Sequence, residues 1–321
     1  MNKTRVNIIV SMIKVVFIVV FASCTSSEAT SQSLQSRIEK KVIRIAKKKK
    51  IPSLAITILS DDDFWDFHYT NEDVDFQEVY GIGSTTKLLA AVVVLKLVEE
   101  EKLSLKDKVD AYVTGLEHII NIESVTIRDL LSHTSGLHDF TKHLSWIRMV
   151  IENRTPRTFT EKIGLVDNQL SQRGVFNYSN TNYLVLEKVV ESITGKSYIK
   201  AFNDFYVDHA LPEIQLGRPN GEIQSFFAKE LKTVANVSAW REYYGYAGEV
   251  YTTSKALFKF SKALFMENSI LKPESINQLK EWVPMGPNSI PISAEGRIEA
   301  YGNGLMRLSF NGEEYVGHSG G

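Results

Sequence analysis

The stretch Tyr80-Gly81-Ile82-Gly83-Ser84-Thr85-Thr86-Lys87, followed by the apolar run Leu88-Leu89-Ala90-Ala91-Val92-Val93-Val94-Leu95, decides how the rest of this chain is interpreted. Ser84 and Lys87 are three positions apart, so on a helix both side chains lie on one face, with Cβ atoms roughly 5–6 Å apart. Apolar residues continue nearly all round the helix behind them, which predicts a helix buried in the centre of a domain. The two glycines before Ser84 allow a sharp turn into that helix.

This arrangement suits a nucleophilic serine that is activated by a lysine. A free lysine, with a pKa of about 10.4, is protonated at neutral pH and cannot accept a proton. Burial disfavours the ammonium form, so a desolvated Lys87 can act as a base toward Ser84. The S-x-x-K pattern is weak by itself, because it also occurs at Ser11/Lys14, Ser197/Lys200 and Ser269/Lys272. Only Ser84 combines a glycine turn, a helix start and a buried helix.

The composition is that of an ordinary globular protein. The chain has 321 residues, 43% of them hydrophobic and 23% charged, and a net charge of −1. This length allows one large domain or two small ones, and the charge balance gives no sign of nucleic-acid binding. The seven histidines show no ligand spacing such as H-E-x-x-H, so we expect no metal site and no other cofactor. The oligomeric state is left open by the sequence.

The N-terminus has the form of a targeting segment. An apolar run over residues 15–21 follows basic residues and is too short to span a bilayer comfortably. Phe21-Ala22-Ser23-Cys24 resembles a bacterial lipobox, so we expect a lipoprotein signal peptide over residues 1–23 and a lipid anchor on Cys24, the only cysteine. An ordinary cleaved signal with a chance cysteine is the alternative. Residues 24–33, rich in Ser and Thr, predict a flexible tether.

Periodicity and turn residues predict an α+β fold. At the two ends of the domain we expect a helix over 34–50 and strands over 54–59, 64–69, 301–310 and 314–318, the last two joined by a tight turn at Asn311-Gly312. Helices fill the middle, about 100–250, and the sheet is expected to gather both chain ends. Capping residues predict helices over 127–132, after Thr126, and over 254–266. The aromatic and glycine-rich segment 240–250 is expected to line a cleft or an edge.

Two further motifs complete a site around Ser84. In Tyr178-Ser179-Asn180 a phenol can relay a proton, and an amide can orient both a lysine and a substrate carbonyl. The Y-x-N pattern is weak alone, because it also occurs at Tyr69 and Tyr301. In Gly317-His318-Ser319-Gly320-Gly321, a strand ending in glycines can bring a backbone N–H to a developing oxyanion.

His133 lies in the stretch Leu130-Leu131-Ser132-His133-Thr134-Ser135-Gly136-Leu137 and invites a catalytic interpretation. No carboxylate stands at an obvious orienting position, so we favour a structural, hydrogen-bonded histidine. The motif around Ser319 also matches G-x-S-x-G, the nucleophile elbow of α/β-hydrolases. That interpretation requires a helix after Ser319, and then an acid and a histidine further along. The sequence ends two residues later, so we reject it.

Taken together, these motifs and their order resemble the serine β-lactamase and D-alanyl-D-alanine carboxypeptidase superfamily, in particular the branch with class C β-lactamases, DD-peptidases and related esterases. The resemblance covers roughly residues 34–321, and the stretches 51–55, 247–253 and 301–304 also contribute to it. It implies a β-lactamase/DD-peptidase-like fold, in which an antiparallel sheet with flanking helices is joined to an all-helical subdomain. In the family, two more strands and a C-terminal helix follow the third motif. We therefore expect a truncated product or a piece of a longer sequence, with poor stability and little activity.

The resemblance also implies roles for individual residues. Ser84 would be the acylated nucleophile, with Lys87 and Tyr178 sharing the general-base and proton-shuttle work. Asn180 would bind the substrate amide and steady Lys87. The positions expected to contact the substrate around the third motif are His318, Ser319 and Gly320, and the backbone N–H groups of Ser84 and Gly321 would form the oxyanion hole. His318 stands where β-lactamases carry lysine, which is more compatible with a peptidase or an esterase.

The sequence therefore predicts a serine hydrolase that works through an acyl-enzyme on Ser84. Its substrate would be a D-Ala-D-Ala-type peptide, a β-lactam or a small ester or peptide. With the lipid anchor, it would sit on a bacterial membrane, facing the periplasm or the exterior. The alternative is a non-catalytic, penicillin-recognising or structural envelope lipoprotein, which would be labelled stoichiometrically without turnover.

Overall fold

The computed structural model describes residues 28–49, 51, 53–60, 63–70, 79–151, 158–217, 226–227, 235–236 and 244–320. The predicted signal peptide, Cys24 and Gly321 lie outside these residues. Across the described part of the chain, no helix combines the length and apolar character needed to cross a membrane.

The first described elements are a long helix and a hairpin. Helix α1 (Glu28–Lys49) precedes the antiparallel strands β1 (Ser53–Ser60) and β2 (Asp63–Thr70). The helix begins six residues before the expected position 34, so part of the segment predicted to be a flexible tether is helical. Residues 28–33 contain neither Gly nor Pro, so nothing in that sequence stops the helix from extending toward the N-terminus.

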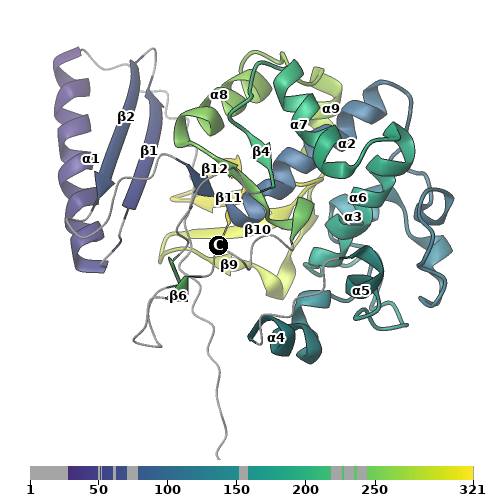
Figure 1. Ribbon diagram of the computed structural model, residues 1–321. Coiled ribbons are helices and arrows are strands. Elements are labelled where there is room, and N and C mark those ends of the chain that lie inside the picture. The colour runs from purple at the N-terminus through teal and green to yellow at the C-terminus, as the bar shows by residue number, and fades with distance from the viewer. Residues whose placement is uncertain are drawn as a thin grey trace, which may run out of the picture.

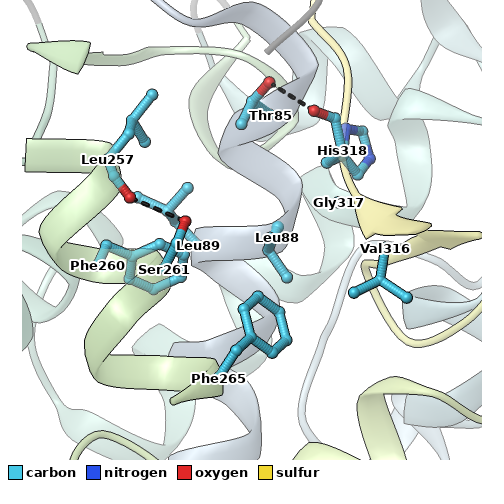
Figure 2. Close-up of a pocket in the computed structure, with 10 residues that line it drawn as sticks. All are labelled: Thr85, Leu88, Leu89, Leu257, Phe260, Ser261, Phe265, Val316, Gly317 and His318. Atoms are coloured by element: carbon cyan, nitrogen blue, oxygen red, sulfur yellow. Dashed lines mark hydrogen bonds between the residues drawn. The ribbon is translucent and has the colours of Figure 1, made fainter. Parts of the chain in front are cut away.

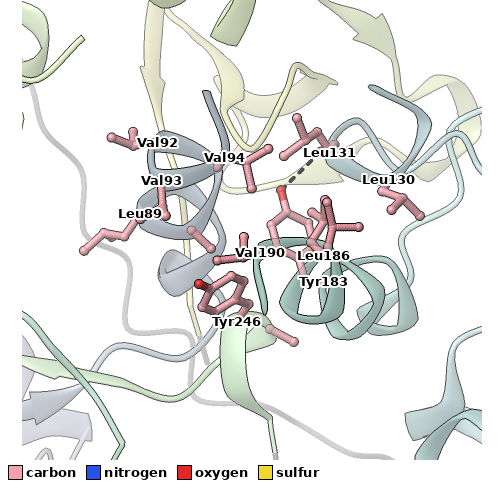
Figure 3. Close-up of a cluster of buried hydrophobic side chains, with 14 of the residues drawn as sticks. Leu89, Val92, Val93, Val94, Leu130, Leu131, Tyr183, Leu186, Val190 and Tyr246 are labelled. Carbon is pink, nitrogen blue, oxygen red and sulfur yellow. Dashed lines mark hydrogen bonds between the residues drawn. The ribbon is translucent and has the colours of Figure 1, made fainter. Parts of the chain in front are cut away.

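Helix α2 (Thr86–Glu99) forms the centre of the molecule, as its sequence predicts (Figure 1). It follows the short strand β3 (Tyr80–Gly81) and a 3₁₀ turn, η1 (Gly83–Thr85). Leu89, Val92 and Val94 have no exposed surface, and helix α6 (Asn180–Thr194) packs against this apolar helix (Figure 3). Because α2 is apolar on nearly all of its faces, the hydrophobic effect favours burying the whole helix in the core.

Helices fill the middle of the chain, as predicted. The described helices and 3₁₀ turns between α2 and the C-terminal sheet are η2 (Val109–Ala111), η3 (Ile122–Ser124), α3 (Ile127–Leu131), η4 (Phe140–Lys142), α4 (Leu144–Ile151), α5 (Phe159–Ile163), α6, α7 (Tyr198–Asp208), η6 (Gly245–Ala247), α8 (Ser254–Phe265) and α9 (Pro273–Leu279). A further turn, η7 (Gly286–Asn288), lies within the C-terminal sheet. The predicted cap at Thr126 is confirmed: its hydroxyl accepts a hydrogen bond from the backbone N–H of Asp129, whose carboxylate accepts one from the N–H of Thr126. Thr253 likewise caps α8.

The C-terminal sheet consists of β8 (Val283–Pro284), β9 (Ile290–Pro291), β10 (Gly296–Tyr301), β11 (Met306–Phe310) and β12 (Glu313–Gly317). The prediction of one strand over 301–310 is wrong, because the chain reverses between β10 and β11. Gly304, with φ +87°, lies in that reversal and is pressed against α2: a Cβ there would lie 2.4 Å from the Cβ of Ala91. The turn predicted at Asn311-Gly312 joins β11 to β12.

The expectation that one sheet gathers both chain ends is also wrong for the described residues. β1 and β2 form a two-stranded sheet, whereas β12 is the edge strand of the C-terminal sheet (Figure 1). The hairpin contacts the rest of the molecule at α8, where the hydroxyl of Thr57 donates to that of Ser254, and at β3, where the hydroxyls of Ser53 and Tyr80 lie 2.7 Å apart. A third small sheet places β7 (Val250–Thr252) between β3 and β4 (Gln215–Leu216), and β5 (Phe226–Phe227) pairs with β6 (Ala235–Asn236). The β1–β2 hairpin and the C-terminal sheet are separate because no described strand pairs with both of them.

Candidate active site

Ser84 and Lys87 lie side by side at the start of the central helix. Ser84 is in the middle of η1, partly exposed, and Lys87 lies in the first turn of α2 with no exposed surface. The lysine Nζ is 3.2 Å from Ser84 Oγ, 2.9 Å from Asn180 Oδ1 and 2.6 Å from the backbone oxygen of Ala247. The last two atoms can only accept hydrogen bonds.

The surroundings of Lys87 favour its neutral form. Burial lowers the pKa of its amine from 10.5 to about 7, and the charge of Asp139 opposes this shift. A neutral amine has two hydrogens and one lone pair. The two hydrogens satisfy Asn180 Oδ1 and the Ala247 carbonyl, so the lone pair faces the hydroxyl of Ser84. This geometry makes Lys87 a base directed at the serine.

Asn180 begins helix α6, and its amide orientation is fixed from both sides. Its oxygen accepts from Lys87, and its Nδ2 donates to Asp139 Oδ2 at 3.1 Å and to Thr141 Oγ1 at 3.2 Å. Asp139 is in turn held by the backbone N–H and the hydroxyl of Thr141. The carboxylate therefore presents the amide oxygen, rather than the amide nitrogen, to the lysine.

Tyr178 closes the site from the loop before α6. Its hydroxyl is within hydrogen-bonding reach of Ser84, and Lys87 Nζ lies 4.9 Å from the centre of its ring. Burial raises the pKa of this phenol above its ordinary value of 10. At neutral pH the phenol therefore keeps its proton. The geometry favours Lys87 as the base and Tyr178 as a relay, instead of an equal division of the base role.

His133 holds the loop that carries Tyr178. Its Nδ1 accepts hydrogen bonds from the backbone N–H of Ser179 at 3.2 Å and from Asn182 Nδ2 at 3.0 Å, so the ring proton is on Nε2. The ring lies 4.2 Å from that of Tyr178, centre to centre. Burial, and then the nearby Lys87, lower the pKa of His133 well below its usual value. The histidine is a neutral structural residue, as its sequence context predicted.

The end of β12 runs beside the nucleophile. Thr85 Oγ1 donates to the carbonyl of His318 at 3.5 Å (Figure 2). A Cβ on Gly320 would lie 1.9 Å from the Ile82 oxygen and 3.0 Å from the Ser84 nitrogen, so only glycine fits there. This contact brings the third motif against the backbone of Ser84, which was one of the two predicted oxyanion donors. The other, Gly321, lies outside the described residues.

His318 does not present a free ring nitrogen to a substrate. Its Nδ1 donates to the Ser319 carbonyl at 2.7 Å, so its Nε2 accepts the hydrogen bond from the Tyr301 hydroxyl at 2.8 Å. The residue is buried, and desolvation, followed by the charge of Lys87, lowers the pKa of His318 to about 3. The expected contact with a substrate carboxylate therefore lacks a positive charge at neutral pH.

The competing motif matches are not assembled into a site. Ser197 caps α7, and Lys200 pairs with Asp204 instead of with that serine. The phenol of Tyr301 is occupied by His318, and Ser319 Oγ contacts the sulfur of Met306 at 3.7 Å. Among the described residues, no group of three or more His, Cys, Asp or Glu side chains could hold a metal ion.

Three contributors were not predicted from the sequence. The Ala247 carbonyl holds Lys87, Asp139 orients Asn180, and Tyr301 fixes the ring of His318. Ala247 and Tyr301 lie in the stretches that carried the family resemblance. Every residue has a backbone carbonyl, however, so the residue type at position 247 does not show that its carbonyl is used. Asp139 lies two residues after the end of the Leu-Ser-His-Thr-Ser-Gly-Leu motif, and this proximity was the available signal.

An apolar hollow lies on another side of α2, between α2, α8 and the end of β12 (Figure 2). Leu88, Phe260 and Val316 are among the residues that line it. The side chains of Lys87, Asn180 and Tyr178 do not line it, so the hollow does not contain the reactive groups.

Comparisons with known proteins identify the family of this chain. The Beta-lactamase family model matches residues 38–321. The chain is 29% identical to Protein flp of Staphylococcus aureus (strain N315) over 178 residues, which are 52% of this chain and 35% of that protein. It thus spans less than half the length of the curated relatives that it matches.

Solved structures share the fold. A D-stereospecific amidohydrolase from Streptomyces sp. superposes with a TM-score of 0.68 at 25% identity, covering 84% of this chain and 81% of that one. The octameric penicillin-binding protein homologue from Pyrococcus abyssi gives a TM-score of 0.70 at 23% identity, covering 89% and 68%. The motifs, the assembled geometry and the family match over nearly the whole described chain lead to one conclusion: this chain belongs to the Beta-lactamase family.

Proposed function

We propose that this chain hydrolyses amide or ester bonds through an acyl-enzyme on Ser84. One observation carries the proposal: a lysine with no exposed surface lies 3.2 Å from the Ser84 hydroxyl, and two acceptor-only oxygens occupy its other contacts. A lysine in this environment loses its proton near neutral pH and can take up the proton of the serine.

The proposed reaction has two halves. In the first, Ser84 Oγ attacks the substrate carbonyl carbon while its proton passes to Lys87 Nζ, and the backbone N–H of Ser84 donates to the resulting oxyanion. When the intermediate collapses, the bond to the leaving group breaks, and that group takes the proton from Lys87 through the hydroxyl of Tyr178. In the second half, water attacks the ester on Ser84, Lys87 accepts its proton, and the acid product leaves with the serine restored.

The environment of His318 narrows the substrate class. A neutral histidine, with both ring nitrogens already paired, offers no fixed positive charge to a carboxylate. We therefore favour small amides, esters or peptides over β-lactams, whose carboxylate would lack this partner. The similarity to a D-stereospecific amidohydrolase supports amide substrates. D-Ala-D-Ala-type peptides end in a carboxylate, so the same argument ranks them, with β-lactams, below neutral amides and esters.

We further propose that the protein is a lipoprotein of the bacterial cell envelope. The support is the sequence alone: the lipobox-like stretch that ends at Cys24. The test is mass spectrometry of the N-terminal peptide from isolated membranes. A diacylglyceryl group on Cys24 is expected, and an unmodified or absent Cys24 in the mature protein would refute the anchor.

The catalytic proposal is tested by covalent labelling. The full chain is incubated with p-nitrophenyl butyrate and, separately, with a fluorescent penicillin, and intact mass and peptide mapping locate the adduct. We expect butyrylation at Ser84, none in Ser84→Ala, and retention of the Ser84 adduct in Ser319→Ala. Loss of the adduct in Ser319→Ala alone would overturn the assignment. Stoichiometric labelling without release of further p-nitrophenol would favour a non-catalytic binding protein.

A further inference from the structure

Two buried carboxylates hold the loop that supplies the Ala247 carbonyl. This loop, residues 244–249, is called the Ala247 loop below. Glu187 Oε1 accepts the backbone N–H of Tyr246 at 2.9 Å, and Glu249 Oε2 accepts that of Gly245 at 2.8 Å. These N–H groups open the short turn η6 and have no partner within it, because the first N–H groups of any helical turn lack one.

The contact between Glu187 and the loop is tight. Gly245 has φ +47°, and a Cβ added to it would lie 2.0 Å from Glu187 Oε1. Glu187 is 3% exposed and Glu249 5% exposed, although carboxylates are rarely buried unless they serve as partners. The described hydrogen bonds of both carboxylates go to the Ala247 loop.

The two oxygens that accept hydrogen bonds from Lys87, Asn180 Oδ1 and the Ala247 carbonyl, are therefore both positioned by residues on one face of α6. Asn180 and Glu187 are seven positions apart, which is two helical turns, so they lie on the same side of the helix. Asn180 contacts Lys87 itself, and Glu187 contacts it through the Ala247 loop. The residue that follows the loop, Val250 of β7, is tied to α2, since its N–H donates to Thr86 Oγ1 at 3.1 Å.

We propose that Glu187 is a positioning residue for acylation of Ser84, and that the Glu187–Glu249 pair must hold a proton to keep the Ala247 carbonyl in place. This inference rests on the proposed function. With the carbonyl in place, the two hydrogens of the neutral amine are fixed, and its lone pair points at the serine. When both carboxylates are charged, their repulsion loosens the loop and the base loses its direction.

The charges around Glu187 support a shared proton. Burial raises the pKa of Glu187 to about 8; Lys162 of α5 and the Tyr246 N–H oppose the rise, while Glu249 and Glu191 add to it. Two phenols also face this pair, Tyr198 of α7 and Tyr246 of the loop, and burial keeps both protonated by raising their pKa values. Lys162, itself 5% exposed, is the cation beside Glu187 among the described residues.

The test is the pH dependence of the single-turnover acylation rate with p-nitrophenyl butyrate, using the full chain. We expect the wild-type rate to peak between the pKa of Lys87, about 7, and that of Glu187, about 8, and to fall about sixfold from that peak by pH 9, where about one pair in ten keeps its proton. In Glu187→Gln, which keeps an acceptor oxygen and cannot ionise, we expect near wild-type acylation at pH 7 and no alkaline fall. Glu191→Gln, one turn further along α6, is the matched control and should retain the fall.

The outcomes separate this inference from the proposed function. A wild type that is acylated at Ser84 but shows no alkaline fall, or a Glu187→Gln variant that keeps it, overturns the inference and leaves the function standing. A wild type that is not acylated overturns both. If Glu187→Gln does not fold, as judged by circular dichroism, Glu249→Gln replaces it: without the second charge there is no repulsion, so the alkaline fall should disappear, and an unchanged profile would refute the role of the pair.

Discussion

The neutral state of Lys87 can be tested without any substrate, by replacing Lys87 with methionine and measuring stability at two pH values. Methionine has a similar length and no charge. In the folded protein the pKa of Lys87 is lowered from 10.5 to about 7. Between these values the unfolded chain binds a proton that the folded chain does not, so the wild type becomes more stable as pH rises.

The magnitude follows from the same pKa values. Each pH unit between the folded and unfolded pKa values is worth about 1.4 kcal/mol, and half of the folded molecules have already lost the proton at pH 7, so the gain from pH 7 to pH 9 is about 2 kcal/mol. Lys87→Met lacks this gain. The free energy of unfolding of the variant minus that of the wild type should therefore drop by about 2 kcal/mol between the two pH values.

Urea denaturation followed by circular dichroism measures this difference. Other groups that titrate in this range, Glu187 among them, are present in both proteins and cancel from it. Leu264→Ala, a truncation in the core of α8, is the control, because its cost should be the same at both pH values. If the Lys87→Met difference is also the same at pH 7 and pH 9, the lysine is protonated in the folded protein, and the base assigned to Ser84 is wrong.

Two glycine substitutions test how closely the backbone packs around the site. Gly320→Ala should reduce the rate of Ser84 acylation by about 100-fold, because the added Cβ would lie 1.9 Å from the Ile82 oxygen and displace the end of β12. Gly317→Ala is the control, because no atom lies within 4 Å of its added Cβ. Equal acylation rates in the two variants would contradict this packing. Gly304→Ala should lower the melting temperature far more than Gly312→Ala, since both glycines have positive φ but only the first meets a side chain of α2 at 2.4 Å. Thermal unfolding compares the second pair, and equal shifts would show that the β10–β11 turn is not packed on α2.

Local sequence features predicted individual elements well. The apolar run after Lys87 predicted a buried helix because no face of it carries a polar stripe, and α2 has that burial. The Thr126 cap and the Asn311-Gly312 turn were predicted for a similar reason: each depends on hydrogen bonds or dihedral angles within a few residues. The strand over 301–310 was predicted wrongly because the turn at Gly302-Asn303-Gly304 was not recognised; the chain reverses there with Gly304 at φ +87° and its backbone packed against α2.

The sequence by itself determined the family, and it supplied the proposed nucleophile Ser84 and its neighbouring Lys87, because residue types at fixed spacing carry that information. Only the tertiary structure decided which of several Y-x-N and S-x-x-K matches meet, that His318 is neutral and turned toward Tyr301, and that Glu187 reaches Lys87 through the Ala247 loop. The physical reason is that proton affinity depends on burial and on neighbouring charges, and that backbone carbonyls and N–H groups are identical in every residue except proline. Neither property can be seen until the chain has folded around the site.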